Sequence, residues 1–125
     1  MIYGVGTDIV AIARMDAFYQ RHGERALEKL LAPAERDDCR AATQPGRFLA
    51  KRFAAKEALG KALGTGVRAP LLLPAVAVEH GELGQPHFAY APDLAAHLDG
   101  LGVRAHLSLS DESDNALAFV IVETL

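Results

Sequence analysis

The stretch Arg47–Gly66, RFLAKRFAAKEALGKALGTG, constrains the fold of this chain more than any other segment. Over Phe48–Leu63 nearly every residue is a good helix former and proline is absent, so the sequence predicts a helix of about four turns. Pro45-Gly46 should break the chain before this helix, and Gly64 should end it. The other elements of the chain must therefore pack around one long central helix.

Two faces of the predicted helix differ in character. At about 100° per residue, one stripe is apolar, and it consists of Phe48, Ala55, Leu59 and Ala62. Another face carries Glu57 and Lys61 beside Ala50 and Ala54, which are small enough to let another element or a ligand approach. By themselves, Glu57 and Lys61 fit either a surface ion pair between residues i and i+4 or part of a functional site.

Composition predicts one globular domain over residues 1–125. Half of the residues are hydrophobic, which is enough for a core and too many for a disordered tail. No apolar run reaches the ~18–20 residues of a membrane span, and the N-terminus lacks a basic and apolar signal sequence. A single cysteine, Cys39, excludes an intrachain disulfide. We therefore expect a soluble cytoplasmic protein that does not bind membranes.

The net charge of −3 conceals two unlike parts of the chain. Residues 14–68 hold twelve of the thirteen basic residues and seven of the sixteen acidic ones, a local charge of +5. This separation predicts an anionic partner, although solvated helix faces are the alternative. Nucleic acid is not expected, because the whole domain is acidic, aromatic residues make up only 6%, and no nucleic-acid motif occurs. A phosphorylated small molecule or an acidic protein fits better.

The order of the elements favours an α+β fold, with helices packed on a mostly antiparallel sheet. The predicted strands are Met1–Ile9, Pro74–Glu79, His87–Tyr90, Val103–Ser110 and Ala116–Val122. The predicted short helices are Arg14–His22, Glu24–Leu31, Pro33–Arg40 and Pro92–Leu101. The last strand is apolar on both faces, so it should be central in the sheet or covered by another subunit. On Val103–Ser110 the polar face fits either solvent exposure or a ligand wall.

The first strand contains two glycines and an acid. Gly4 and Gly6 predict close approach by a backbone or a ligand. Asp8 lies among apolar residues and fits either a turn or capping residue or a ligand to a cation. Two carboxylates completed by water and phosphate oxygens are a usual way to hold Mg²⁺, and Glu57 is the second acid in a small or apolar context. Sequence spacing alone does not bring Asp8 to Glu57.

A lysine and a glycine loop complete the set of groups that phosphoryl transfer uses. Lys61 lies one helical turn beyond Glu57, where it could contact a phosphate bridged by the same metal. The Gly64-Thr65-Gly66 triplet offers backbone N–H groups for an anion, or is a plain turn. Because the triplet follows a helix C-terminus, where the dipole disfavours anions, a phosphate there would need Lys61 or a metal.

Four motifs together resemble one enzyme family. They are GTDIVAIAR (Gly6–Arg14), FAAKEALGKALGTG (Phe53–Gly66), GQP (Gly84–Pro86) and HLSLSDE (His106–Glu112). In this order and in a chain of this length, they closely resemble the bacterial holo-[acyl-carrier-protein] synthases, the short-chain 4′-phosphopantetheinyl transferases. These enzymes move 4′-phosphopantetheine from coenzyme A to a serine of apo-acyl carrier protein in fatty acid biosynthesis, and they release 3′,5′-ADP.

The resemblance implies roles for individual residues. Asp8 and Glu57 match the Mg²⁺ ligands of the family, and Lys61 matches its phosphate-contacting lysine. The segments that wrap the nucleotide match Gly64, Thr65, Gly66, Pro86, His106 and Ser108. Arg14 and the basic helices that carry Arg21 and Arg25 match the surface that meets the acidic carrier protein. The family also forms homotrimers with sites between subunits.

Two points of chemistry stay open within that resemblance. A water on the metal, oriented by Asp8, is preferred as the base for the serine proton, with Glu57 second, because a carboxylate on Mg²⁺ is less basic than a free one. Some relatives have a histidine where this chain has Asp111, so the resemblance does not carry a nucleotide contact over to that position.

Two other functions are compatible with parts of the sequence. A non-catalytic module with a basic docking face would leave Asp8 and Glu57 as structural residues. A transferase for carrier domains of peptide or polyketide synthases would be about twice as long, so 125 residues favour the fatty-acid type.

Overall fold

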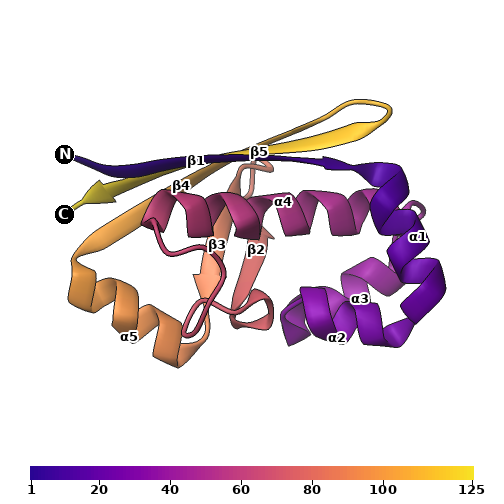
Figure 1. The fold of residues 1–125 in the computed structure, drawn as a ribbon, viewed down its shortest axis with the longest axis horizontal. Helices are drawn as coiled ribbons and strands as arrows, with labels where there is room; N and C mark the ends of the chain where they lie inside the picture. The colour runs from indigo at the N-terminus through magenta and orange to yellow at the C-terminus, as the bar shows by residue number, and fades with distance from the viewer.

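The central helix α4, Pro45–Leu63, is the axis of the protein. The computed structural model describes all residues, 1–125, and places α4 beneath a three-stranded antiparallel sheet (Figure 1). The sheet has the order β1-β5-β4, with β1 at Ile2–Ala11, β5 at Asn115–Thr124 and β4 at Val103–Asp111. The predicted α+β class is therefore confirmed, and β5 is the central strand, as predicted.

The remaining helices lie toward the two ends of α4, and a β-hairpin lies beneath its middle (Figure 1). At one end lie α1 (Ile12–His22), α2 (Glu24–Leu30) and α3 (Pro33–Ala41). The others are η1 (Leu73–Ala75), the hairpin β2 (Val76–His80) and β3 (Pro86–Tyr90), and α5 (Pro92–Leu101). No helix combines the length and the apolar character needed to cross a membrane.

Several predicted boundaries were wrong by two or more residues. Strand β1 ends at Ala11 and not at Ile9, α1 begins at Ile12 and not at Arg14, and β5 ends at Thr124 and not at Val122. Helix α4 begins at Pro45 instead of after Gly46, because proline suits the first helical position, where no N–H is needed for the helix. The segment Leu73–Ala75 forms a 3₁₀ turn, so the strand predicted from Pro74 begins at Val76. Gly64 ends α4 in the left-handed conformation, as expected (φ 80°).

Strand β1 lies directly against the backbone of α4. A Cβ atom on Gly4 would overlap the carbonyl oxygen of Ala62, and one on Gly6 would overlap that of Ala58. The predicted close approach by a backbone is thus confirmed, and it is the reason for glycine inside a strand. Because side chains alternate along a strand, Asp8 faces α4 like Gly6 and Val10.

The outer face of the sheet is uncovered, and it is largely apolar over β1 and β5. In the β1–β5 register, Val5 is opposite Ile121 and Ile9 is opposite Leu117. Val5 and Ile9 are more than half exposed, at 52% and 64%, and Phe119 between them is 38% exposed. The central strand is therefore buried on one face only, against α4, although its sequence is apolar on both.

Candidate functional site

Asp8 and Lys61 meet where β1 crosses α4. The Lys61 ammonium lies 3.1 Å from Asp8 Oδ1 and donates a second hydrogen bond of 2.9 Å to the Thr7 carbonyl. No ion pair forms between Glu57 and Lys61, so the interpretation of these residues as an i,i+4 surface pair is wrong. The Asp8 side chain is 17% exposed and that of Lys61 is 54% exposed, which leaves the pair open to a ligand from solvent.

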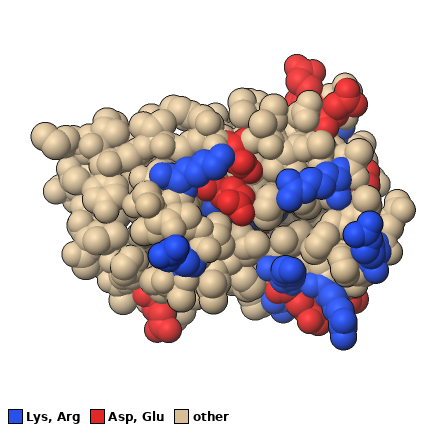
Figure 2. All heavy atoms as spheres, viewed as in Figure 1, with Lys and Arg blue, Asp and Glu red and all other residues tan.

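Glu57 lies close enough to Asp8 for the two carboxylates to repel each other. Burial raises the pKa of Glu57, the negative charge of Asp8 raises it further, and Lys61 and Arg14 act in the opposite direction. Packing of β1 on α4 therefore supplies what sequence spacing could not, since it brings both predicted acids to one place. Figure 2 shows acidic side chains between basic ones on the face that displays α4.

The donor set at this place fits Mg²⁺. No three His, Cys, Asp or Glu side chains gather anywhere in the chain, so the site offers two carboxylates and no third ligand of that kind. Mg²⁺ binds through one or two carboxylates and keeps its other positions for water and phosphate oxygens. The mutual repulsion of Asp8 and Glu57, which raises the pKa of Glu57, would be relieved by a cation between them. Asp8 and Glu57 are the residues that would hold the metal.

The glycine loop after α4 is less open to an anion than its sequence suggests. The Gly64 N–H donates to the Lys61 carbonyl, and the Gly66 N–H donates to the Gly60 carbonyl. The Thr65 hydroxyl donates to the Gly66 carbonyl at 3.0 Å. The expectation of several exposed N–H groups was therefore wrong for both glycines, because these groups close the helix end.

The other predicted nucleotide residues lie away from the acids of the same chain. His106 and Ser108 are on β4 opposite Ile121 and Phe119, so their side chains belong to the outer face of the sheet, whereas Asp8 belongs to the inner face. His106 lies 3.1 Å from Glu123, and both are exposed. Pro86 begins β3 in the separate hairpin. One chain alone does not gather these residues around Lys61.

Two of the three predicted carrier-binding arginines share a groove. A cavity of about 440 Å³ lies between α1, α2, α4 and η1. Its lining is apolar with a basic rim, and consists of Arg14, Met15, Ala17, Phe18, Arg21, Lys29, Leu30, Phe53 and Leu73. The Arg14 guanidinium lies 5.6 Å from the centre of the Phe53 ring, within reach of a cation–π contact. Arg25 is exposed on α2 and lies outside the groove.

Asp111 is engaged by two cations of α4. Arg47 donates to Asp111 at 2.7 Å, and Lys51 lies 3.5 Å from the same carboxylate. This hydrogen bond from Arg47 holds the pKa of Asp111 below its usual range. Arg47 also donates to the carbonyls of Glu112 and Ser113, so it ties the β4–β5 turn to the start of α4.

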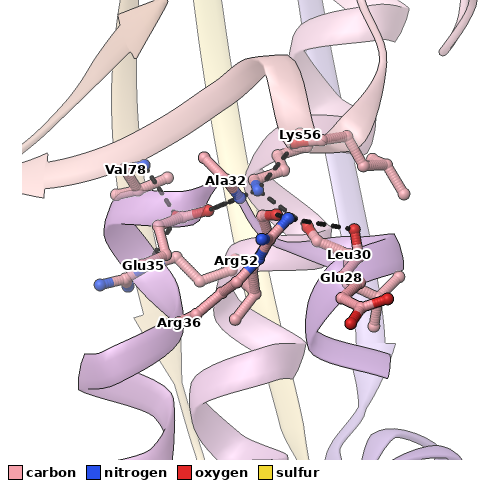
Figure 3. A network of polar contacts seen from close by, with 10 residues as sticks. Glu28, Leu30, Ala32, Glu35, Arg36, Arg52, Lys56 and Val78 are labelled. Carbon is pink, nitrogen blue, oxygen red and sulfur yellow. Dashed lines mark hydrogen bonds and ion pairs between the residues drawn. The ribbon is translucent and has the colours of Figure 1, made fainter. Parts of the chain in front are cut away.

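Sequence reasoning missed a buried charge cluster beside the site. Lys56, Glu35 and Arg52 are 0%, 3% and 7% exposed (Figure 3). A signal was available for Lys56, because at about 100° per residue it falls between Leu49 and Leu63, which are both buried. Nothing in the sequence pairs it with Glu35, which lies on another helix.

Comparison with known proteins identifies the family. The sequence model of the 4'-phosphopantetheinyl transferase superfamily matches residues 4–120. The chain belongs to this superfamily. It is 58% identical over 123 residues to the holo-[acyl-carrier-protein] synthase of Dechloromonas aromatica (strain RCB), with 98% of each chain covered. The resemblance found in the four motifs is therefore confirmed, and the chain is a transferase of the holo-[acyl-carrier-protein] synthase type.

Solved structures give the same family and fold. The crystal structure of holo-[acyl-carrier-protein] synthase from Neisseria meningitidis is similar with a TM-score of 0.95 and 43% identity, covering 99% of this chain and 100% of that chain. The synthase from Bacillus anthracis str. Ames, a complex with CoA (3',5'-ADP), has a TM-score of 0.83 at 28% identity, covering 100% of this chain and 99% of that chain. The whole chain, from β1 to β5, thus has the fold of these enzymes.

Proposed function

We propose that this protein transfers 4′-phosphopantetheine from coenzyme A to a serine hydroxyl of apo-acyl carrier protein, with Mg²⁺, in fatty acid biosynthesis. The observation that carries the proposal is the meeting of Asp8, Glu57 and Lys61 where β1 packs on α4. The similar synthase from Bacillus anthracis binds CoA (3',5'-ADP), which supports the choice of donor. The proposed setting is the cytoplasm, as the sequence predicts.

The reaction moves one phosphoryl group between two oxygens. The serine oxygen forms a bond to the β-phosphorus of coenzyme A, and the bond from that phosphorus to the bridging pyrophosphate oxygen breaks. The products are holo-acyl carrier protein and 3′,5′-ADP, and the serine proton goes to a base. Catalysis of such a transfer consists mainly of positioning and charge stabilisation, which suits a site made of two acids and a lysine.

Each side chain has a distinct task in this proposal. Asp8 and Glu57 would hold Mg²⁺, which when bound supplies positive charge next to the pyrophosphate. Lys61, half exposed, exchanges its bond to Asp8 for a phosphate oxygen. Carboxylates that hold Mg²⁺ are less basic than free ones, so a water oriented by Asp8 is better suited than Glu57 to accept the serine proton.

The basic groove beside the site is the proposed dock for the carrier protein. It combines Arg14 and Arg21 with the Phe18 and Phe53 rings, which suits an acidic helix that presents an apolar side chain. Phe53 and Glu57 are one turn apart on α4, so a carrier in the groove would present its serine near the acids. Arg25, outside the groove, would act at longer range.

A homotrimer is part of the proposal. The outer sheet face, with Val5, Ile9 and Phe119 exposed, is a contiguous apolar surface of the kind that another subunit covers. His106 and Ser108 lie at the β4 edge of that face, so they could complete the nucleotide site of a neighbouring subunit. Light scattering at micromolar concentration measures the oligomeric state. A monomer would contradict nucleotide sites that are shared between subunits.

The decisive experiment measures the product. Protein, apo-carrier protein, coenzyme A and Mg²⁺ are mixed, and the mass of the carrier protein is measured by mass spectrometry. We expect this mass to increase by that of one phosphopantetheine group. No added mass, while a known synthase works in parallel, would refute the activity. A non-catalytic docking module would also bind the carrier, but calorimetry would then find no Mg²⁺-dependent binding of coenzyme A.

A further inference from the structure

Within the buried charge cluster, the Lys56 ammonium uses all of its hydrogen bonds to join α4 to other elements. The three N–H donors of Lys56 reach Glu35 Oε1 at 2.6 Å, the Leu30 carbonyl at 2.8 Å and the Leu73 carbonyl at 3.0 Å. Leu30 is the last residue of α2, so its carbonyl lacks a partner within the helix. Lys56 therefore fastens the end of α2 and the turn η1 to α4.

Glu35 extends the same cluster toward α3 and β2. Its carboxylate accepts from the N–H groups of Ala32 and Val78, each at 2.9 Å, and the Arg52 Nε lies 3.1 Å from it (Figure 3). Through these contacts one acid and one lysine join every element that surrounds the groove except α1. The Lys56 ammonium and both Glu35 oxygens are hydrogen-bonded, whereas the buried Arg52 Nε, although close to Glu35, makes no hydrogen bond. Satisfied buried groups such as Lys56 and Glu35 fix the relative positions of the elements that they join.

Two of the three Lys56 bonds go to residues that line the groove. Leu30 and Leu73 form walls of the cavity that also contains Arg14 and Phe53. Lys56 is also the immediate neighbour of Glu57 on α4, and Phe53 lies three residues before it. The same turn of α4 therefore holds two groove residues through Lys56 and carries Glu57 at the proposed reaction site.

Stability alone does not account for this arrangement. Replacing a buried ion pair by apolar residues of similar volume is often neutral or stabilising, so such a pair is weak support for a purely stabilising role. We propose that Lys56 and Glu35 are positioning residues, which hold Leu30 and Leu73 so that the carrier protein docked in the groove brings its serine to Asp8 and Glu57. This inference rests on the proposed function, because it assigns the groove to the carrier.

The test is a double variant that removes both charges of the Lys56–Glu35 pair, Lys56→Met with Glu35→Gln. Arg52 then loses Glu35 as a counter-ion but keeps its guanidinium 4.3 Å from the centre of the Phe48 ring. We expect the KM for apo-carrier protein to rise at least tenfold, while the KM for coenzyme A and kcat at saturating carrier change less than twofold. Leu98→Ala is the control, because it makes a hole in the core under α5, away from the groove. It should lower thermal stability without changing the carrier KM.

An unchanged carrier KM in the folded double variant would overturn the inference and leave the proposed function intact. If wild-type protein forms no product, the proposed function itself fails, so the two failures are distinguishable. Should the double variant not fold, hydrogen exchange in the wild type decides. Apo-carrier, and not coenzyme A, should slow exchange of the Ala32 and Val78 amides more than that of Ala95 in α5. Equal slowing at all three would overturn the inference.

Discussion

Two acid–lysine clusters on α4 use the same residue types in opposite environments. At Glu35 and Lys56 every donor has a partner and the side chains are at most 3% exposed. At Asp8, Glu57 and Lys61 the lysine is half exposed and two carboxylates repel each other. A satisfied cluster fixes structure, whereas an open and unbalanced one has charge left for a ligand. The difference is set by which face of α4 each lysine occupies.

The largest effect on stability should come from removing one partner of the buried Glu35–Lys56 ion pair. Glu35→Ala leaves the ammonium of Lys56 buried without its counter-ion, which should cost about 3–5 kcal/mol of unfolding free energy. Urea unfolding followed by circular dichroism measures it. Glu24→Ala, which removes an exposed acid paired with Arg40, should leave the unfolding midpoint unchanged. Equal losses of unfolding free energy for the two variants would show that burial does not determine how much each ion pair contributes to stability.

The open cluster should lose activity and keep the fold. Asp8→Ala removes a carboxylate that would hold the metal, and we expect transfer to fall about 10²–10³-fold, the range for losing one electrostatic contact in a transition state. The melting temperature should stay near that of the wild type, because the lost group is partly exposed and repels Glu57. Glu82→Ala, in the β2–β3 turn, is the matched acidic control. Normal transfer by Asp8→Ala would contradict the metal assignment.

A third change tests how the open cluster is assembled. Gly6→Ala places a methyl group against the Ala58 carbonyl, so β1 must shift from α4 and carry Asp8 away from Lys61. We expect a loss of about 1–3 kcal/mol of unfolding free energy together with reduced transfer. Gly100→Ala adds the same methyl group in α5, where nothing lies within 4 Å, and should leave transfer unchanged without lowering the unfolding free energy, because alanine is the better helix former. A stable and fully active Gly6→Ala protein would refute the close packing.

The smallest effect concerns the proton on Glu57 in metal-free protein. Asp8→Asn removes a negative neighbour and should lower the pKa of Glu57, and Lys61→Met should raise it. Carbon-13 NMR of the labelled carboxyl measures both shifts. If neither variant moves this pKa, the carboxylates do not share a site.

The sign of the linked stability change follows from the raised pKa. Folding raises the pKa of Glu57 above 4.5, so the native protein binds this proton more tightly than the unfolded chain. The stabilisation is fully present below the unfolded pKa and is lost as the pH rises through the folded pKa. Asp8→Asn should bring the folded pKa of Glu57 closer to its unfolded value, so the pH range over which this stabilisation is lost should become narrower. Urea unfolding at several pH values measures that range.

Local rules determined much of this protein from its sequence. Gly64 predicted a helix end, Gly4 and Gly6 predicted close approach by a backbone or a ligand, and the alternation in Val103–Ser110 predicted a strand; the structure has all three features. These features depend on residues near one another in the chain, whose conformational preferences are known. The four motifs then indicated the family.

The tertiary structure decided which charges meet. Lys61 pairs with Asp8 and not with Glu57, four residues away, because the glycine contact brings β1 onto α4 beside it. Glu35 finds Lys56, and Asp111 finds Arg47, from elements far apart in the sequence. Such pairs depend on how whole elements pack, and a charged side chain carries no local mark of a distant partner. For that reason the same residue types form a buried structural cluster at Glu35 and Lys56 and an open site at Asp8, Glu57 and Lys61.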